Sequence, residues 1–277
     1  IRRGPSPAIA WGDGITWRKL SPMVRYETAG VRATITIDEP ERRNPLSTAT
    51  MAELLEHTRA AQADPAVKVI VYTGAGERAF SAGGDLSSGF VNDPLGLHRD
   101  RGVLADLFRA MWRGGKPTVA RVNGHALAGG FGLAVACDIT VCVEEAKLGT
   151  PEIDVGLWPM MITVPLLRAM PAKAVLELMM TGRIIGPDEA FRLGAVSRVV
   201  TRAELDPAVD EIVSGLAAKS PAVMMLGRDA FDTVLGLDID SALEHLQAGL
   251  TAVALTEDSR EGVAAFIEKR APRWTGR

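Results

Sequence analysis

The sequence has few cysteines, little net charge and no long apolar run. Its only two cysteines, Cys137 and Cys142, lie within an apolar stretch, so we expect buried, unreactive thiols and no disulfide framework. Lys and Arg total 31 against 34 Asp and Glu, which gives a net charge of -3. This balance provides no basic surface for nucleic acid or an anionic membrane, so any polyanionic ligand must be held by local contacts.

The sequence also shows no apolar pattern typical of a membrane span or of an export signal. The longest apolar candidate, from Phe131 to Val143, is interrupted by Asp138 and falls short of the about 20 residues that cross a bilayer. The N-terminal segment carries Arg2 and Arg3 without the apolar stretch of a secretory signal. We therefore expect a cytoplasmic protein without membrane contact, in which residues 1–22 form a poorly ordered leader.

Short strands and helices are present in an order typical of an α/β protein. Apolar and polar residues alternate over 31–38, as in a half-buried strand. Ser47 or Thr50 followed by Glu53 predicts the capping box of a helix that runs toward Pro65. Further strands are predicted over 67–73, 117–122, 139–143, 148–151 and 196–200.

Helical patterns dominate the C-terminal part of the chain. The last two helices are predicted over 239–254 and 259–269, where they could pack away from the α/β layers. We therefore expect an α/β core over residues 23–205 and a separate C-terminal helical lobe over residues 206–277.

Two glycine-bearing turns, Ser81–Asp85 and Ala126–Gly130, follow predicted strands. A thioester that reacts at its α or β carbon builds negative charge on the carbonyl oxygen, and two converging backbone N–H groups stabilise that charge. Glycine lets the backbone approach closely, and the second turn leads into a helix whose N-terminal dipole adds to the effect. Taken singly, each turn is equally typical of an ordinary strand-to-helix connection.

A third glycine pattern, over residues 74–79, fits the G-x-G-x-x-A fingerprint of dinucleotide-binding proteins. That fingerprint requires a helix that begins within the glycines. Ser81, Gly83 and Gly84 would interrupt such a helix almost at once, so the pattern disfavours a dehydrogenase.

Four longer segments, Thr36–Ser47, Thr73–Leu86, Val122–Asp138 and Gly186–Val200, occur in the order found in the crotonase, or enoyl-CoA hydratase/isomerase, family. Residues 257–270 also resemble the closing helix of that family, so the resemblance covers about Val31 to Gly276. It implies the crotonase (ClpP/crotonase-like) α/β fold of repeated ββα units, with the C-terminal helices serving in trimerisation.

The resemblance also implies roles for individual residues. The N–H groups of Gly84 and Gly129 would form an oxyanion hole, and the carbonyl of Ala82 would recognise the adenine amino group of coenzyme A. Residues that would line the path of coenzyme A are Arg43, Asn44, Pro45 and Leu46. Phe266 and Lys269 would reach the nucleotide bound to a neighbouring subunit.

The same resemblance implies the ligand and the assembly. Coenzyme A would enter as part of an acyl-CoA thioester substrate, with no permanently bound cofactor. The protein would form a homotrimer or a dimer of trimers. No cluster of His, Cys or carboxylate residues has the spacing of metal ligands, so no metal is expected.

The number of carboxylates decides which reaction is expected. Hydratases of this family generally use two glutamates, and the position of the first, three residues after the second oxyanion glycine, is Gly132 in this sequence. The position of the second is Glu152. One base suffices to move a double bond, because it removes a proton from one carbon and returns it two carbons away. We therefore expect enoyl-CoA isomerisation, with hydration or non-catalytic binding of acyl-CoA as alternatives.

Glu152 and several other residues allow a second interpretation of their role. Glu152 could be a surface carboxylate at a strand end. In an extended backbone Asp154 would project to the same side as Glu152 and act as an auxiliary carboxylate. The segment Leu157–Ile162 replaces the usual glycine-rich stretch of the family. His125 is expected to pack against its turn, and Ser81 lacks the G-x-S-x-G context of a hydrolase nucleophile.

Overall fold

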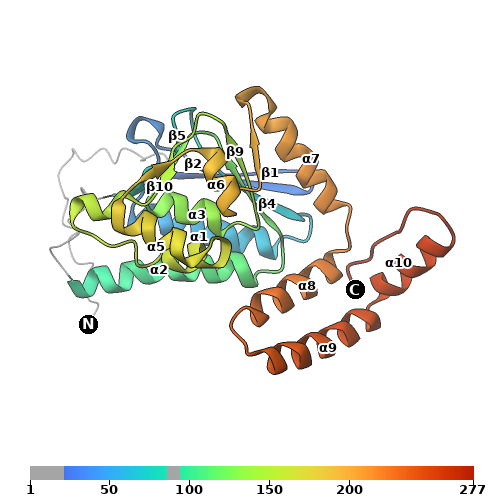
Figure 1. Ribbon diagram of the computed structural model, residues 1–277. Coiled ribbons are helices and arrows are strands. Elements are labelled where there is room, and N and C mark those ends of the chain that lie inside the picture. The colour runs from blue at the N-terminus through green and yellow to red at the C-terminus, as the bar shows by residue number, and fades with distance from the viewer. Residues whose placement is uncertain (1–21, 86–93) are drawn as a thin grey trace, which may run out of the picture.

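The computed structural model describes residues 22–85 and 94–277 (Figure 1). Its larger sheet has the order β1-β2-β4-β7-β9-β12 within that part of the chain. The strands are β1 (Val24–Ala29), β2 (Arg32–Ile37), β4 (Val69–Gly74), β7 (Thr118–Val122), β9 (Ile139–Val143) and β12 (Arg198–Val200). β1 and β2 are antiparallel and all other neighbours are parallel. Every residue of β4 is buried, as expected for an inner strand of a covered parallel sheet.

A smaller sheet has the order β11-β10-β8-β5. Its strands are β5 (Ala79–Ser81), β8 (His125–Leu127), β10 (Leu148–Gly149) and β11 (Ile184–Ile185). β5, β8 and β10 are parallel and β11 is antiparallel to β10. A further parallel pair joins β3 (Pro45–Leu46) to β6 (Gly83–Gly84).

The main strands β7 and β9 are each followed directly by a strand of the smaller sheet and then by a helical segment, whereas β4 is followed by β5, then β6 and α2. The α-helices are α1 (Thr48–Ala63), α2 (Pro94–Arg113), α3 (Gly129–Ala136), α4 (Thr163–Ala169), α5 (Ala172–Thr181), α6 (Pro187–Leu193), α7 (Leu205–Ala217), α8 (Pro221–Val234), α9 (Ile239–Leu255) and α10 (Glu257–Ile267). Three short 3-10 helices are η1 (Pro40–Arg42), η3 (Pro151–Val155) and η4 (Arg202–Glu204). The expected repetition of ββα units is confirmed.

The C-terminal helices divide into two groups. α7 packs against β9, β7 and β4 of the larger sheet. α8, α9 and α10 instead form a group beside the core, in which α8 lies nearest the core (Figure 1). The exact limits of a C-terminal lobe remain a prediction. Among the described residues no helix is both long enough and apolar enough to cross a membrane.

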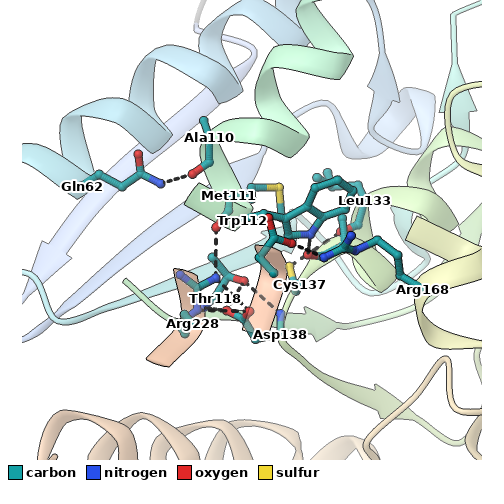
Figure 2. Close-up of polar contacts among 12 residues, drawn as sticks. Gln62, Ala110, Met111, Trp112, Thr118, Leu133, Cys137, Asp138, Arg168 and Arg228 are labelled. Atoms are coloured by element: carbon teal, nitrogen blue, oxygen red, sulfur yellow. Dashed lines mark hydrogen bonds and ion pairs between the residues drawn. The ribbon is translucent and has the colours of Figure 1, made fainter. Parts of the chain in front are cut away.

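A network around Asp138 joins α8 to the core (Figure 2). Its Oδ2 accepts hydrogen bonds from the backbone N–H and the hydroxyl of Thr118 at 2.6 and 2.8 Å. Its Oδ1 accepts from Nη2 of Arg228 on α8 at 2.8 Å. Nearby, the guanidinium of Arg168 lies 4.8 Å from the ring centroid of Trp112 and pairs with Asp232 of α8. These contacts fix one side of α8 beside a cavity of about 920 Å³ between the core and the last helices.

The structure corrects two details of the expected elements. Ser47 is the N-cap of α1 and accepts from Thr50 N at 3.1 Å, but the predicted capping box is wrong. The Glu53 carboxylate instead accepts from the backbone N–H of Val24 in β1, at 2.8 Å. The strand predicted over 148–151 ends at Gly149, because Pro151 begins η3.

Strand β1 was not predicted from the sequence. It alternates weakly, with only Val24 buried and Tyr26 partly buried.

The structure also decides the rival interpretation of the glycines at residues 74–76. After the glycines of residues 74–76 the chain enters β5 and forms no helix, so the structure excludes the dinucleotide-binding interpretation. Cys137 and Cys142 are buried and unpaired with each other, as expected.

Candidate active site

The three principal candidate residues follow the ends of three adjacent parallel strands. Gly84 lies three residues beyond Ser81 at the end of β5, and Ser81 is paired with Ala126 of β8. Gly129 lies two residues beyond the end of β8. Glu152 lies three residues beyond the end of β10, which is paired in parallel with β8. Because the carboxyl ends of parallel strands meet at one edge of a sheet, the topology gathers all three residues at one edge, where α/β proteins commonly bind ligands.

The two glycine turns approach each other closely. A Cβ atom placed on Gly83, whose φ is +89°, would lie 3.0 Å from the amide nitrogen of Gly129 and 2.6 Å from Cβ of Ala128. A Cβ atom placed on Gly129 would lie 3.8 Å from the amide nitrogen of Gly84. Glycine is therefore required at position 83 both for the backbone conformation and for the space. The two predicted donors come from adjoining stretches of backbone.

The backbone pairing leaves the Gly84 N–H on the side away from β3. The carbonyl of Leu46 accepts a hydrogen bond from Asp85 N at 3.4 Å. Successive N–H groups of an extended strand point to opposite sides, so the preceding N–H, that of Gly84, faces the other way. Gly84 is also exposed. Gly129 begins α3, and Ala128 before it is held with φ of 51° by its N–H bond to Gly149 O at 2.9 Å.

Two buried asparagines hold the turn that precedes Gly84. Asn44 accepts from Glu39 N at 3.0 Å and donates to the carbonyls of Ala75 and Ala79 at 3.0 and 2.8 Å. Asn123 accepts from Gly74 N at 3.1 Å and donates to Gly76 O at 2.7 Å. Asn123 was not predicted as a site residue, since nothing in its local sequence shows which distant turn it binds.

The residues expected along the coenzyme A path differ in exposure. Asn44, Pro45 and Leu46 are buried, whereas Arg43 is exposed and Ala82 is partly exposed. Ala82 N donates to Arg43 O at 2.9 Å, so a backbone hydrogen bond joins the segment that carries the exposed Arg43 side chain to the Ala82 turn. Leu46 Cδ1 would lie 3.3 Å from a Cβ atom placed on Gly129, so Leu46 packs against the second turn.

Glu152 lies in η3 and is the electrostatically unusual carboxylate of the site. Its Oε2 is buried and has no hydrogen-bond partner within residues 22–85 and 94–277, and the same holds for the hydroxyl of Thr150. Burial raises the pKa of Glu152 to about 7, against the smaller lowering effect of a hydrogen bond from its own backbone N–H. A carboxylate with one buried, unpaired oxygen and this pKa is typical of a functional group that exchanges protons near neutral pH.

Asp154 does not meet the condition for pairing with Glu152. The backbone forms a 3-10 helix here, so residues two apart project in different directions and are not on the same side. Asp154 is exposed, and both its carboxylate oxygens would lie 3.0 Å from a Cβ atom placed on Gly182. An auxiliary role that depends on an extended backbone is therefore not supported.

Gly132 lies one turn after Gly129 on α3, and the space beside it is filled. A Cβ atom placed on Gly132 would lie 2.1 Å from Cγ2 and 2.4 Å from Cβ of Ile162. Ile162 is only 2% exposed. Ile162 was not predicted to contact this position, since 30 residues separate the two in sequence.

The remaining candidates lie apart from these strand ends. Phe266 is 85% exposed at the end of α10, and Lys269 is exposed with φ of 53°. Their predicted contact with a neighbouring subunit remains a prediction. His125 is in β8, where its Nδ1 accepts a hydrogen bond from Lys147 N at 3.1 Å. Burial, and to a smaller extent nearby positive charges, lower the pKa of His125. Within the described residues, no group of three or more His, Cys, Asp or Glu side chains could hold a metal ion.

The raised pKa of Glu152 predicts a pH dependence of stability. Between its ordinary value of 4.5 and about 7, the folded state holds a proton that the unfolded state has lost. The stability that protonated Glu152 contributes to the folded state is thus fully present below pH 4.5. The free energy of unfolding falls as pH rises from 4.5 toward 7. Glu152→Gln should remove this slope, measured by urea unfolding at several pH values. Equal slopes in the variant and the wild type would contradict the assigned burial of the charge.

The arrangement of these features defines the class of protein. Repeated ββα units, two converging glycine turns and a carboxylate with a buried, unpaired oxygen at the strand ends are those of a crotonase-fold protein. Residues 27–277 match the family described as enoyl-CoA hydratase/isomerase.

Known proteins agree with this assignment. The chain is 35% identical over 250 residues to carnitinyl-CoA dehydratase of Escherichia coli K12, covering 88% of this chain and 94% of that protein. The crystal structure of enoyl-CoA hydratase from Mycobacterium smegmatis superposes with a TM-score of 0.88 at 31% identity, covering 92% of this chain and 99% of the other. Human enoyl coenzyme A hydratase domain-containing protein 3 gives a TM-score of 0.87 at 30% identity, covering 91% and 100%. The chain belongs to the enoyl-CoA hydratase/isomerase family.

Proposed function

We propose that this protein is an enzyme that acts on acyl-CoA thioesters and isomerises the double bond of an enoyl-CoA. The observation that carries the proposal is the carboxylate of Glu152, whose Oε2 is buried without a hydrogen-bond partner among the described residues, at the strand end next to two converging glycine turns. Position 132, where a second carboxylate would be expected, has no side chain and no room for one.

The proposed reaction uses one base twice. The thioester carbonyl oxygen of a 3-enoyl-CoA accepts hydrogen bonds from the N–H groups of Gly84 and Gly129. The Glu152 carboxylate removes a proton from C2, and the C–H electron pair enters a dienolate whose charge is shared by the carbonyl oxygen, C2 and C4. Glu152 then delivers the same proton to C4, which breaks the C3–C4 double bond, leaves a C2–C3 double bond and gives the 2-enoyl-CoA. A pKa of about 7 suits both steps, because the group must accept and release a proton at similar cost.

Hydration is the second candidate, and the names of the relatives favour it. The E. coli relative is named a carnitinyl-CoA dehydratase and the M. smegmatis structure an enoyl-CoA hydratase. Addition of water to a 2-enoyl-CoA would need a group other than residue 132 to activate the water. A non-catalytic acyl-CoA-binding protein is the third alternative, because the first carboxylate position is vacant.

Incubation with a 3-enoyl-CoA and, separately, with a 2-enoyl-CoA distinguishes these functions. Isomerisation predicts that the 3-enoyl-CoA yields the conjugated 2-enoyl-CoA, detected by its ultraviolet absorbance. Formation of 3-hydroxyacyl-CoA from the 2-enoyl-CoA at a comparable rate would assign hydration. Binding of both thioesters without any product would assign the non-catalytic function.

The proposed contacts to coenzyme A use exposed groups near the first turn. Arg43 is exposed and could bind a phosphate, while the Ala82 carbonyl would accept a hydrogen bond from the adenine amino group. In a homotrimer or a dimer of trimers, Phe266 and Lys269 of one subunit would approach the nucleotide bound by the next. Their high exposure in the single chain is consistent with that proposal.

Self-association is supported by an apolar stripe along α9. Its side chains recur every three or four residues, so they share one face of the helix: Ile239, Leu243, Leu246 and Leu250, which are 41 to 78% exposed. The double substitution Leu243→Glu and Leu250→Glu should lower the mass in solution, measured by sedimentation. Ala248→Glu, on the opposite side of α9, provides the matched control. An unchanged mass in the double variant would exclude this face from the assembly.

A further inference from the structure

Ile162 fills the volume that a side chain at position 132 would occupy. Both Cγ2 and Cβ of Ile162 would lie within 2.4 Å of a Cβ atom on Gly132, whereas its Cα would lie 3.5 Å away, at ordinary contact distance. Shortening Ile162 to alanine would therefore leave the clash, and only glycine at position 162 would remove it. The two positions form a complementary pair in which one residue has a side chain and the other has none.

The filled volume lies beside the first turn of α3. Gly132 N donates to Ala128 O at 3.1 Å, so Gly129 and Gly132 are one turn apart on the same side of the helix. A helical side chain leans toward the helix N-terminus, so a side chain at position 132 would lean toward the Gly129 N–H. Ile162 therefore lies where a second reactive group would adjoin the oxyanion donors.

Ile162 is held in place by its neighbours. It is the N-cap of α4, and Leu166 N donates to its carbonyl at 3.1 Å. Both the N–H and the hydroxyl of Thr163 bind the Pro159 carbonyl, at 3.2 and 2.9 Å. The same segment is tied back to the carboxylate residue, because Leu157 N donates to Glu152 O at 3.0 Å. Packing and hydrogen bonds thus prevent Ile162 from yielding to a larger residue at position 132.

We infer that Ile162 is a specificity-determining residue, which restricts the site to the single carboxylate of Glu152 by excluding a second one at position 132. The inference rests on the proposed function, because it explains why that function is proton transfer and not addition of water. Ile162 is the last residue of the segment Leu157–Ile162, which stands where the family resemblance implies a glycine-rich stretch. An apolar side chain in this volume supplies neither a base nor a hydrogen-bond partner for an attacking water.

A stability cycle tests the packing step without any activity measurement. Gly132→Ala should lower Tm by about 3–10 °C in the wild-type background, because it overpacks the contact with Ile162. In the I162G background the same substitution should raise Tm, since the new methyl group enters the vacated space and alanine favours the helix. Glycine is also acceptable at an N-cap, which is the position of residue 162.

Gly227→Ala is the matched control for this cycle. Gly227 lies within α8, and outside the backbone of its own helix no atom of the described residues lies within 4 Å of a Cβ atom placed on it. The substitution Gly227→Ala should raise Tm by the same amount in the wild-type and the I162G backgrounds. A Gly132→Ala effect of the same sign in both backgrounds would overturn the inference.

The functional step is tested with G132E/I162G against I162G alone. We expect the double variant to hydrate a 2-enoyl-CoA at least about tenfold faster than either I162G or the wild type, since the added carboxylate can activate water. A double variant that binds the thioester but hydrates no faster than I162G would overturn the inference. If the wild type fails to isomerise a 3-enoyl-CoA, the proposed function fails, while the sign of the Tm change still decides the packing step.

Discussion

Glu152→Gln is expected to lower kcat for isomerisation of a 3-enoyl-CoA by about 10²- to 10⁴-fold, the usual effect of removing a positioned proton-transfer group. The amide is nearly the same size as the carboxylate but cannot accept and return the proton. Binding of the thioester should persist, because the oxyanion donors are backbone groups. The measurement is single-turnover kinetics, together with the dissociation constant of a saturated acyl-CoA.

Asp154→Asn makes the same chemical change two residues away. Asp154 is exposed and lies beside Gly182, so its loss should lower kcat by less than about threefold, as for most surface charges. A loss as large as that of Glu152→Gln would restore a two-carboxylate mechanism. Full activity of Glu152→Gln would remove Glu152 from the reaction.

The wild-type activity should also rise with pH. Glu152 must be deprotonated to act as the base, and burial raises its pKa to about 7. We therefore expect kcat/KM to increase through neutral pH and to reach half its upper limit near pH 7. An activity that is constant between pH 5 and 8 would contradict the assigned role.

Gly84→Pro is expected to reduce kcat by about 10²- to 10³-fold, the effect of losing one oxyanion-hole donor. Proline lacks the N–H that is proposed to bind the thioester oxygen. The paired strand β6 can keep its bond to β3, because Leu46 O accepts from Asp85 N. The reduction should appear in kcat more than in the affinity for coenzyme A, since the donor acts on charge that develops during the reaction.

Gly84→Ala separates the lost donor from the added atoms. It keeps the N–H, and nothing lies within 4 Å of the added Cβ among the described residues. It should therefore lower kcat far less than Gly84→Pro does. Equal losses in the two variants would mean that the loop was displaced, and circular dichroism with Tm values would show whether the fold is intact.

Local sequence predicted the strands of the larger sheet except β1, and only β10 of the smaller sheet, because the determinants of those strands are local. Alternation of apolar and polar residues over 31–38 predicted β2, a run of mostly apolar residues predicted β4, and Ser47 predicted the start of α1. Where the predicted capping box failed, a distant partner had decided the outcome. Glu53 binds Val24 N and does not close a capping box, because β1 packs next to the start of α1.

For the candidate site, the sequence determined which chemical groups are available. It placed glycine at positions 84, 129 and 132, a carboxylate at Glu152, and segments in the order of a known family. Those assignments are properties of residue type and spacing, which the chain carries whether or not it is folded.

Only the tertiary structure decided how these groups act together. It brought the glycine turns into contact and buried one oxygen of Glu152. Through the 3-10 helix it also directed the Asp154 side chain away from the side of Glu152. It also placed Ile162 against Gly132. Burial and close packing depend on atoms that are remote in sequence, so no local pattern could show the raised pKa of Glu152 or the space that Ile162 closes.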